Sequence, residues 1–393
     1  MSPARLGVSA TPTGVLHVER RPRTRPGYGE HVTDISAATR GPLRTGDRVR
    51  LADLTTFRVG GPATSLVVAG TTDALIDAVS GCDARGEPVL VVGGGSNLLV
   101  ADEGFEGTVV LVRTEGVELE SADACGGAAL RVAAGESWDG LVARTVASGH
   151  AGLEALSGIP GSTGATPVQN VGAYGQEVAQ TVTTVRTWDR LERRIRTFAN
   201  ADCEFGYRHS RFKEERYAHG PRFVVLEVSF QLLVADLSAP VGYAELARRL
   251  GVDVGARAPL AQVRDAVLEL RRGKGMVLDP EDPDTTSAGS FFTNPLLDAD
   301  LADRLPEGAP RWPAGDGLVK ASAAWLIEQA GFGRGFGLPG PASLSTRHAL
   351  ALTNRGEATA SDLLALARTV RDGVRDRFGI ELVPEPVLVN CSL

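Results

Sequence analysis

Apolar residues recur with two different spacings along the first half of the chain. One spacing predicts an amphipathic helix over residues 75–82, with Thr72 as its cap and Gly86 just after its end. A second helix is expected from Ser137 to Gly149. Short apolar runs with the length of buried strands occur at residues 65–68, 89–92, 108–112 and 129–133. This alternation predicts an α+β or α/β fold.

The pattern changes near residues 234–240, which interrupt the periodicity and are predicted to form a domain boundary. Before them, residues 182–188 read as a strand. Apolar and polar residues then alternate over 224–232, which predicts a strand with one buried face. After the boundary, helices are expected at about 260–272, at 320–330 and after Thr359, which begins a capping box.

Two glycine-rich segments interrupt these elements. Residues 157–175 contain five glycines and two prolines without a charged side chain, and residues 88–100 run as a buried strand into Gly93, Gly94 and Gly95. Glycine lets the backbone approach a ligand and turn its N–H groups toward an anion. The spacing is not the dinucleotide-binding GxGxxG pattern, because its third glycine would fall on Leu98. A phosphorylated cofactor bound by backbone groups is predicted.

Composition narrows the class of protein. The 393 residues suffice for two or three domains, and a net charge of −7 argues against a nucleic-acid partner. The four cysteines lie far apart, which favours a reducing cytoplasm and no bound metal. No apolar run is long enough to span a membrane, so no membrane insertion is expected. Residues 1–45, with arginines concentrated at 20–25, are predicted to be a disordered extension.

Three polar residues stand in segments that packing alone explains poorly. Arg208 follows a glycine and a tyrosine, Ser290 precedes two phenylalanines, and Glu385 is fixed between two prolines. An arginine fork suits a carboxylate or phosphate, and a rigidly held carboxylate can steer a proton. Each also has an ordinary explanation: a surface ion pair, a turn serine or a solvated edge glutamate. Tyr243 and Lys274 are further candidates on loops.

Six ordered motifs between about residues 55 and 389 resemble the UDP-N-acetylenolpyruvoylglucosamine reductase family, in its form with a mobile tyrosine loop. They are TFRVGG at 56–61, VGGGSNLL at 92–99, GIPGSTG at 158–164 with QNVGAYG at 169–175, FGYRHS at 205–210, AGSFFTNP at 288–295 and PEP at 384–386.

This resemblance implies an α+β protein with two domains. Residues 46–234 would form a two-part FAD-binding domain of the vanillyl-alcohol-oxidase-like (PCMH-type) class. Residues 241–393 would form an α/β substrate-binding domain whose last strand returns to the active site. Non-covalent FAD would contact Gly93, Gly94, Gly95, Ser96, Asn97, Leu98, Ile159, Gly161, Gly164, Ala165, Asn170, Gly172, Ala173 and Tyr174.

The resemblance also implies a reaction. Hydride passes from NADPH through FAD to the double bond of UDP-N-acetylglucosamine enolpyruvate, which gives UDP-N-acetylmuramate for peptidoglycan synthesis. Arg208 would polarise the substrate carboxylate, Ser290 would donate the proton and Glu385 would assist. Substrate binding is expected from Tyr243, Lys274, Asn294 and His348. The implied enzyme is a cytoplasmic monomer.

Two alternatives remain open on the residues alone. One is a flavin oxidase or dehydrogenase of the same FAD-binding class, in which a histidine such as His150 tethers the cofactor. The other is a binding protein that keeps the fold without turnover.

Overall fold

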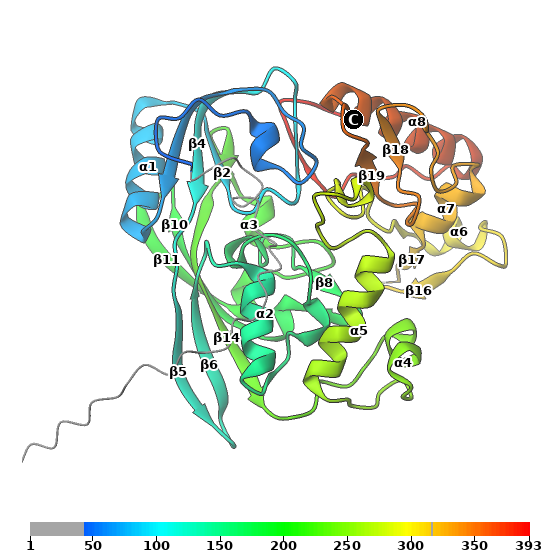
Figure 1. The fold of residues 1–393 in the computed structure, drawn as a ribbon, viewed down its shortest axis with the longest axis horizontal. Helices are drawn as coiled ribbons and strands as arrows, with labels where there is room; N and C mark the ends of the chain where they lie inside the picture. Colours follow the sequence, from blue (N-terminus) through cyan, green and yellow to red (C-terminus); the bar gives the residue numbers. More distant parts are fainter. Residues whose placement is uncertain (1–42, 316) are drawn as a thin grey trace, which may run out of the picture. The chain divides into compact units, whose positions relative to one another are not determined.

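A parallel sheet forms the first layer of the fold (Figure 1). The computed structural model describes residues 43–315 and 317–393, so the predicted extension lies outside the described residues except for its last three positions. Strands β1 (Ala63–Ala69) and β2 (Val89–Val92) pair in parallel with the two sides of β4 (Phe105–Val112). Strand β2 runs directly into Gly93 of the glycine-rich residues 88–100, which we call the first glycine segment. Residues 157–175 are the second glycine segment.

Helix α1 (Thr72–Arg85) crosses from β1 to β2, as the periodicity predicts. Its cap is Thr71 and not Thr72, because the Thr71 hydroxyl accepts a hydrogen bond from the backbone N–H of Ala74. Gly86 ends the helix at φ 65°, where a side chain would be strained.

A larger antiparallel sheet follows, and β14 (Phe223–Val234) is its central strand. The order across the sheet is β11 (Arg194–Ala199), β10 (Val182–Asp189), β14, β6 (Gly127–Ala133) and β5 (Val117–Asp123), with β7 (His150–Ala151) beside the end of β14. Leu226, Val228 and Phe230 are buried, as the alternation predicts. The prediction of one buried face is wrong at Val225, which is also buried.

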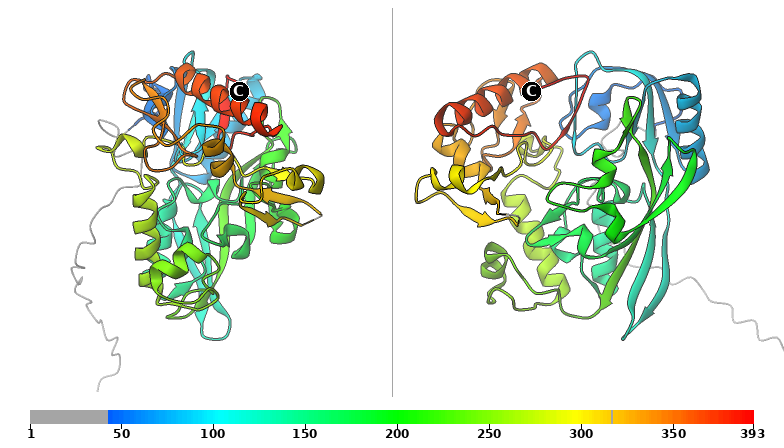
Figure 2. Two further views of the ribbon diagram at one scale, coloured as in Figure 1. Left: turned by 90° about the vertical axis from the view of Figure 1, so that its right-hand side faces the viewer. Right: turned by 180° about the vertical axis from the view of Figure 1, so that it is seen from behind.

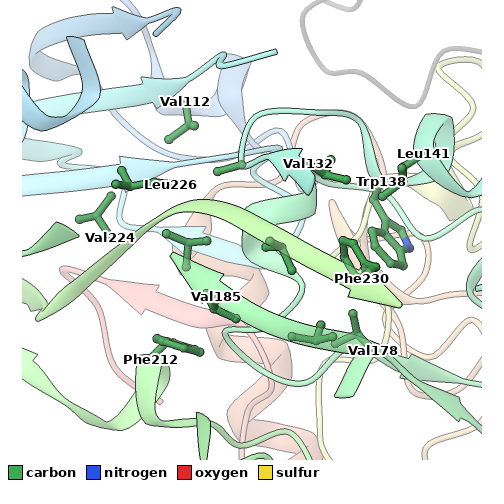
Figure 3. Close-up of a cluster of buried hydrophobic side chains, with 14 of the residues drawn as sticks. Val112, Val132, Trp138, Leu141, Val178, Val185, Phe212, Val224, Leu226 and Phe230 are labelled. Carbon is green, nitrogen blue, oxygen red and sulfur yellow. The ribbon is translucent and has the colours of Figure 1, made fainter. Parts of the chain in front are cut away.

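Side chains from both sheets and three helices, including Phe212 of the short helix α3 (Arg211–Glu214), share one apolar core (Figure 3). Helix α2 (Trp138–Ala147) contributes Trp138, whose ring lies 6.1 Å from that of Phe230. The cap at Ser137 is as predicted, but the helix ends at Ala147, two residues before Gly149. Full burial of such a side chain contributes roughly 1.5–3 kcal/mol, so this core holds α2 beside the second glycine segment.

Further helices and short strands follow β14 in the chain and lie mostly away from the large sheet (Figures 1 and 2). The helices are α4 (Ala244–Leu250), α5 (Leu260–Gly273), α6 (Ala299–Asp303), α7 (Ala323–Gln329) and α8 (Ala360–Phe378). The strands are β15 (Leu296–Leu297), β16 (Arg311–Pro313), β17 (Val319–Ala321), β18 (Ala342–Leu344) and β19 (Leu352–Asn354).

Two helix predictions in this region are tested directly. The predicted capping box at Thr359 is present and begins α8. The helix expected from residue 320 starts at Ala323, because Val319–Ala321 is strand β17 and Ser322 is the cap.

The last strand, β20 (Val387–Val389), returns to the first part of the chain and pairs in parallel with β3 (Leu98–Val100). Residues 381–386 precede this strand and lie outside it, apart from a single bridge between Pro384 and Phe292. Prolines at 384 and 386 lack the N–H group that a continuous strand needs. The pairing therefore brings Glu385 beside the first glycine segment.

Candidate functional site

A cavity of about 480 Å³ lies between the two glycine segments. Gly93 to Leu98 form part of its wall, and residues 159–162 and 164–166 form another. Arg208, Ser290 and Glu385 also line it. The structure thus brings together three residues that are distant in sequence and that the sequence analysis selected separately.

The glycine segments contact each other as well as the cavity. A Cβ atom added to Gly94 would lie 2.5 Å from the Cα atom of Gly161, and one on Gly93 would lie 2.2 Å from the Ser162 Oγ atom. Ser96 Oγ also donates a hydrogen bond of 2.9 Å to the Pro160 carbonyl. The sequence suggested that these glycines approach a ligand, whereas the structure shows that they also let the two segments approach each other.

Most of the residues predicted to contact FAD line this cavity. Three do not: Asn170, Ala173 and Tyr174. Asn170 is buried and its side chain donates to Glu177 and to the Gly206 carbonyl, which fixes the segment that precedes Arg208. The residues that line the cavity are Gly93, Gly94, Gly95, Ser96, Asn97, Leu98, Ile159, Gly161, Gly164, Ala165 and Gly172.

The residues around the cavity fit a phosphorylated cofactor. Thr56 lines it, and the Thr56 hydroxyl is shielded from solvent without a hydrogen-bond partner among the described residues. A buried hydroxyl left in this state costs about 1–3 kcal/mol. The charged side chains that line the cavity are mainly basic, with Arg208, Lys213, Arg216 and Arg271 against Glu385. Backbone donors and excess positive charge suit a diphosphate such as that of FAD.

Arg208 and Glu385 form an ion pair at the cavity wall. Arg208 Nε lies 2.7 Å from Glu385 Oε1, and the Arg208 Nη2 atom donates to the Gly172 carbonyl at 3.1 Å. Arg208 has a φ of 54°, an uncommon conformation for a residue with a side chain. Lys213 Nζ donates to the Arg208 carbonyl at 3.0 Å and holds this backbone in place.

Burial raises the pKa of Glu385 above its ordinary value, although the Arg208 and Lys213 cations oppose the shift. The Glu385 side chain is only 12% exposed, so the ordinary reading of a solvated edge glutamate is wrong. Two side-chain amides lie near the Glu385 carboxylate. Gln169 Nε2 lies 3.4 Å from Glu385 Oε1, and Asn97 Nδ2 lies 2.7 Å from Gln169 Oε1.

Ser290 lies on the neighbouring segment. It precedes Phe291 and Phe292, which are fully buried, and it lines the cavity itself. The Glu385 N–H donates to the Phe291 carbonyl at 2.8 Å. This backbone bond holds the Ser290 segment against the Glu385 segment, so the hydroxyl and the carboxylate belong to the same wall of the cavity.

Three of the residues predicted to bind substrate form a second cluster with Tyr174. The Tyr174 and Tyr243 rings pack edge to face at 5.5 Å, and Lys274 Nζ lies 5.6 Å from the Tyr174 ring centre and 2.6 Å from Glu245. Burial, with the nearby Lys274 charge, lowers the pKa of His348 to about 4. The large cavity is not lined by Tyr243, Lys274 or His348.

Asn294 lies on the other side of Arg208. It lines a second cavity of about 380 Å³, together with Tyr207, Arg208 and Lys213. Its N–H donates to the Tyr207 hydroxyl at 3.2 Å, and its Oδ1 atom accepts from the N–H of Ala323. Arg208 and Lys213 line both cavities, so the two spaces share the wall that these two side chains form.

Four residues that line these cavities were not predicted from the sequence: Gln169, Tyr207, Lys213 and Arg271. The first three stand inside the quoted motifs or beside them, so their signal was present but unspecific. Arg271 follows Arg264 by two helical turns on α5, and burial lowers its pKa. The described residues contain no cluster of three or more side chains suited to hold a metal.

Comparison with known proteins identifies the family. Residues 63–197 match the FAD-binding domain model, and residues 280–389 match the C-terminal domain of UDP-N-acetylenolpyruvoylglucosamine reductase. The reductase of Cutibacterium acnes is 56% identical over 353 residues, which cover 89% of this chain and 92% of that protein. The chain belongs to the UDP-N-acetylenolpyruvoylglucosamine reductase family.

Further members of this reductase family also match most of the chain. The reductase of Streptomyces avermitilis is 57% identical over 87% of this chain and 94% of that protein. The crystal structure of the Thermus caldophilus reductase superposes with a TM-score of 0.57 at 26% identity, and the match covers 88% of this chain and 99% of that one. These findings confirm the predicted α+β fold and its FAD-binding domain. Across the described residues, none of the helices is long and apolar enough to cross a membrane.

Proposed function

We propose that the chain reduces UDP-N-acetylglucosamine enolpyruvate to UDP-N-acetylmuramate, with NADPH as hydride donor and non-covalently bound FAD. The observation that carries the proposal is the meeting of Arg208, Glu385 and Ser290 in the wall of one cavity whose other walls are the two glycine segments. Membership of the reductase family supports the same reaction. Bound FAD would supply hydride transfer, from NADPH to the enolpyruvyl double bond.

Arg208 stabilises the charge that develops on the substrate. Addition of hydride to one carbon of the double bond shifts an electron pair toward the next carbon and the attached carboxylate. A guanidinium aimed at those oxygens lowers the energy of this enolate. Glu385 and the Gly172 carbonyl hold the guanidinium plane before substrate arrives, so little reorganisation is needed.

Ser290 delivers the proton that completes the reduction. The enolate carbon takes the proton from the Ser290 hydroxyl, and the cations that line the same cavity stabilise the alkoxide left behind. Glu385, held beside this segment through the Phe291 carbonyl, assists the transfer.

The remaining polar residues bind the nucleotide sugar. We assign the cluster of Tyr243, Lys274 and His348 to the UDP part, because a lysine and aromatic rings suit a diphosphate and a base. Asn294 faces the second cavity beyond Arg208 and would contact the substrate there. Lys274→Met should raise the KM for the substrate by at least tenfold and leave flavin reduction by NADPH unchanged. An unchanged KM would reject this assignment.

Stopped-flow absorbance tests the proton donor. Ser290→Ala should leave reduction of the flavin by NADPH intact and slow its reoxidation by substrate about 10²–10⁴-fold, the usual contribution of a general acid. Ser361→Ala is the control, because the Ser361 hydroxyl donates to Asp102 away from both cavities. Reoxidation of Ser290→Ala at the parental rate would overturn the role.

We further propose that the FAD is not covalently attached and that the enzyme is a monomer in the cytoplasm, where NADPH and nucleotide sugars are available. His150 does not line the cavity, although His219 does. Under this proposal, acid precipitation should release all yellow colour, and colour retained on the polypeptide would support the tethered oxidase alternative. Light scattering should give the mass of one chain, and fractionation should recover the activity in the cytoplasm.

A further inference from the structure

The side chain of Gln169 links Asn97, in the first glycine segment, to the Glu385 carboxylate. Its Oε1 atom accepts a hydrogen bond of 2.7 Å from Asn97 Nδ2, and its Nε2 atom lies 3.4 Å from Glu385 Oε1. Asn97 Nδ2 also donates to the Glu385 carbonyl at 3.3 Å. All three residues line the large cavity. The Gln169 amide thus joins the glycine turn at Asn97 to a carboxylate that stands 216 residues after Gln169 in the chain.

The contact with Asn97 fixes which way the Gln169 amide points. A primary amide has an acceptor oxygen and a donor nitrogen, and a reversed amide would place two NH₂ groups against each other. The Gln169 nitrogen is therefore directed at Glu385 Oε1. Arg208 Nε donates to the same oxygen at 2.7 Å.

The two carboxylate oxygens of Glu385 are consequently unequal. Oε1 receives both the guanidinium and the amide, while no hydrogen bond to Oε2 is found from the part of the chain that the structure describes. A proton added to Oε1 would compete with two donors, whereas Oε2 can accept it freely.

We propose that Gln169 is a positioning residue that orients Glu385, so that Oε2 is the oxygen that takes up and releases the proton. The inference rests on the proposed role of Glu385. It adds the atom at which the proton is held and the side chain that selects this atom.

The charged and titratable groups that act on Glu385 set the direction of the pH effect. Arg208 and Lys213 lower its pKa, burial raises it, and Tyr207 lies close enough to feel its charge. The Gln169 amide stabilises the ionised form, because it donates to the carboxylate. Loss of this donor therefore moves the titration of Glu385 to higher pH.

The experiment follows the titration directly. Infrared difference spectra of the complete protein, taken against Glu385→Gln as the reference, report the protonated Glu385 carboxyl as a function of pH. Gln169→Leu should raise the midpoint by about one pH unit, and the pH profile of flavin reoxidation should shift in the same direction. A midpoint within the error of the parent would overturn the inference.

Gln176→Leu is the matched control. Gln176 also bridges an N–H group and a glutamate, since its Oε1 accepts from Ala155 and its Nε2 donates to Glu154, but it does not line the cavity. Its loss should lower stability without moving the Glu385 midpoint. An equal shift in Gln176→Leu would show a general loosening of the fold and would also overturn the inference.

Failure of the proposed function has a different signature. If Glu385→Gln reoxidises its flavin at the parental rate, Glu385 does not assist the reaction. The infrared midpoint of Gln169→Leu still shows whether the amide positions the carboxylate.

Discussion

Thr55 and Thr56 are both 3% exposed, but only one of their two hydroxyls makes a hydrogen bond within the described residues. Thr55 Oγ1 donates a hydrogen bond of 3.0 Å to the Val59 carbonyl, while Thr56 Oγ1 has no partner among the described residues. Sequence cannot separate two adjacent threonines, because the difference depends on what each hydroxyl meets after folding.

This pair gives a stability prediction for the protein without cofactor. Thr55→Val should lower the free energy of unfolding by about 1 kcal/mol or more, because it leaves the Val59 carbonyl unpaired. Thr56→Val should leave it unchanged or raise it by up to about 2 kcal/mol, because it removes a buried hydroxyl that lacks a partner. Urea denaturation measures both. A larger loss for Thr56→Val than for Thr55→Val would contradict the assignment.

Single residues of the site were predictable from sequence, but their contacts were not. Arg208 and Glu385 were each selected from local composition and the family motifs, yet they are 177 residues apart and their ion pair exists only in the fold. Gln169 was missed for the same reason. Nothing in the local sequence distinguishes the Gln169 amide, because its contacts with Asn97 and Glu385 form only in the folded protein.

At the scale of elements, the hydrophobic periodicity predicted helices and strands better than it predicted how loops meet. Helix α5 and the capping box of α8 follow from local sequence. The pairing of the glycine segments does not, because glycine has no side chain to mark what it contacts. Only the clash that a Cβ atom would create reveals why Gly94 and Gly161 must be small.

Gly94→Ala tests this contact. The added methyl group would lie 2.5 Å from the Gly161 Cα atom, so the two segments must separate, and both FAD affinity and stability should fall. We expect at least a tenfold rise in the dissociation constant for FAD, measured by quenching of flavin fluorescence.

The control is Gly273→Ala at the end of helix α5, where a Cβ atom meets nothing within 4 Å and φ is not positive. Alanine there should raise the free energy of unfolding by about 0.5–1 kcal/mol and leave FAD affinity unchanged. Parental affinity in Gly94→Ala would show that the segments tolerate separation.

At the scale of the whole molecule, residues from the beginning and the end of the described chain share one core. Phe57, Val59 and Leu99 pack with Phe291 and Val370. The Asn354 side chain donates to the Phe57 carbonyl at 3.0 Å. Asp102 accepts from the first N–H groups of helix α8. The interrupted periodicity at residues 234–240 predicted a boundary between two domains, but no local pattern could show this shared core.

The shared core predicts one unfolding transition. If the C-terminal part unfolded first, Phe57 and Leu99 would lose their packing, so both parts should melt together. Differential scanning calorimetry should give a single peak with equal calorimetric and van't Hoff enthalpies. Removal of FAD should lower the midpoint without splitting the peak, because the cofactor stabilises only the folded state. Two resolved peaks would refute the prediction.

The parallel pairing of β20 with β3 also has a consequence for biosynthesis. A ribosome delivers the glycine segments and Arg208 well before Glu385, and chains begin to fold from the amino-terminal side as they emerge. The nascent protein therefore exposes the free edge of Leu98–Val100 and an arginine without its acid until translation has passed Val389. A message cut short before Glu385 would yield a chain with most of the cavity walls but without their closing strand.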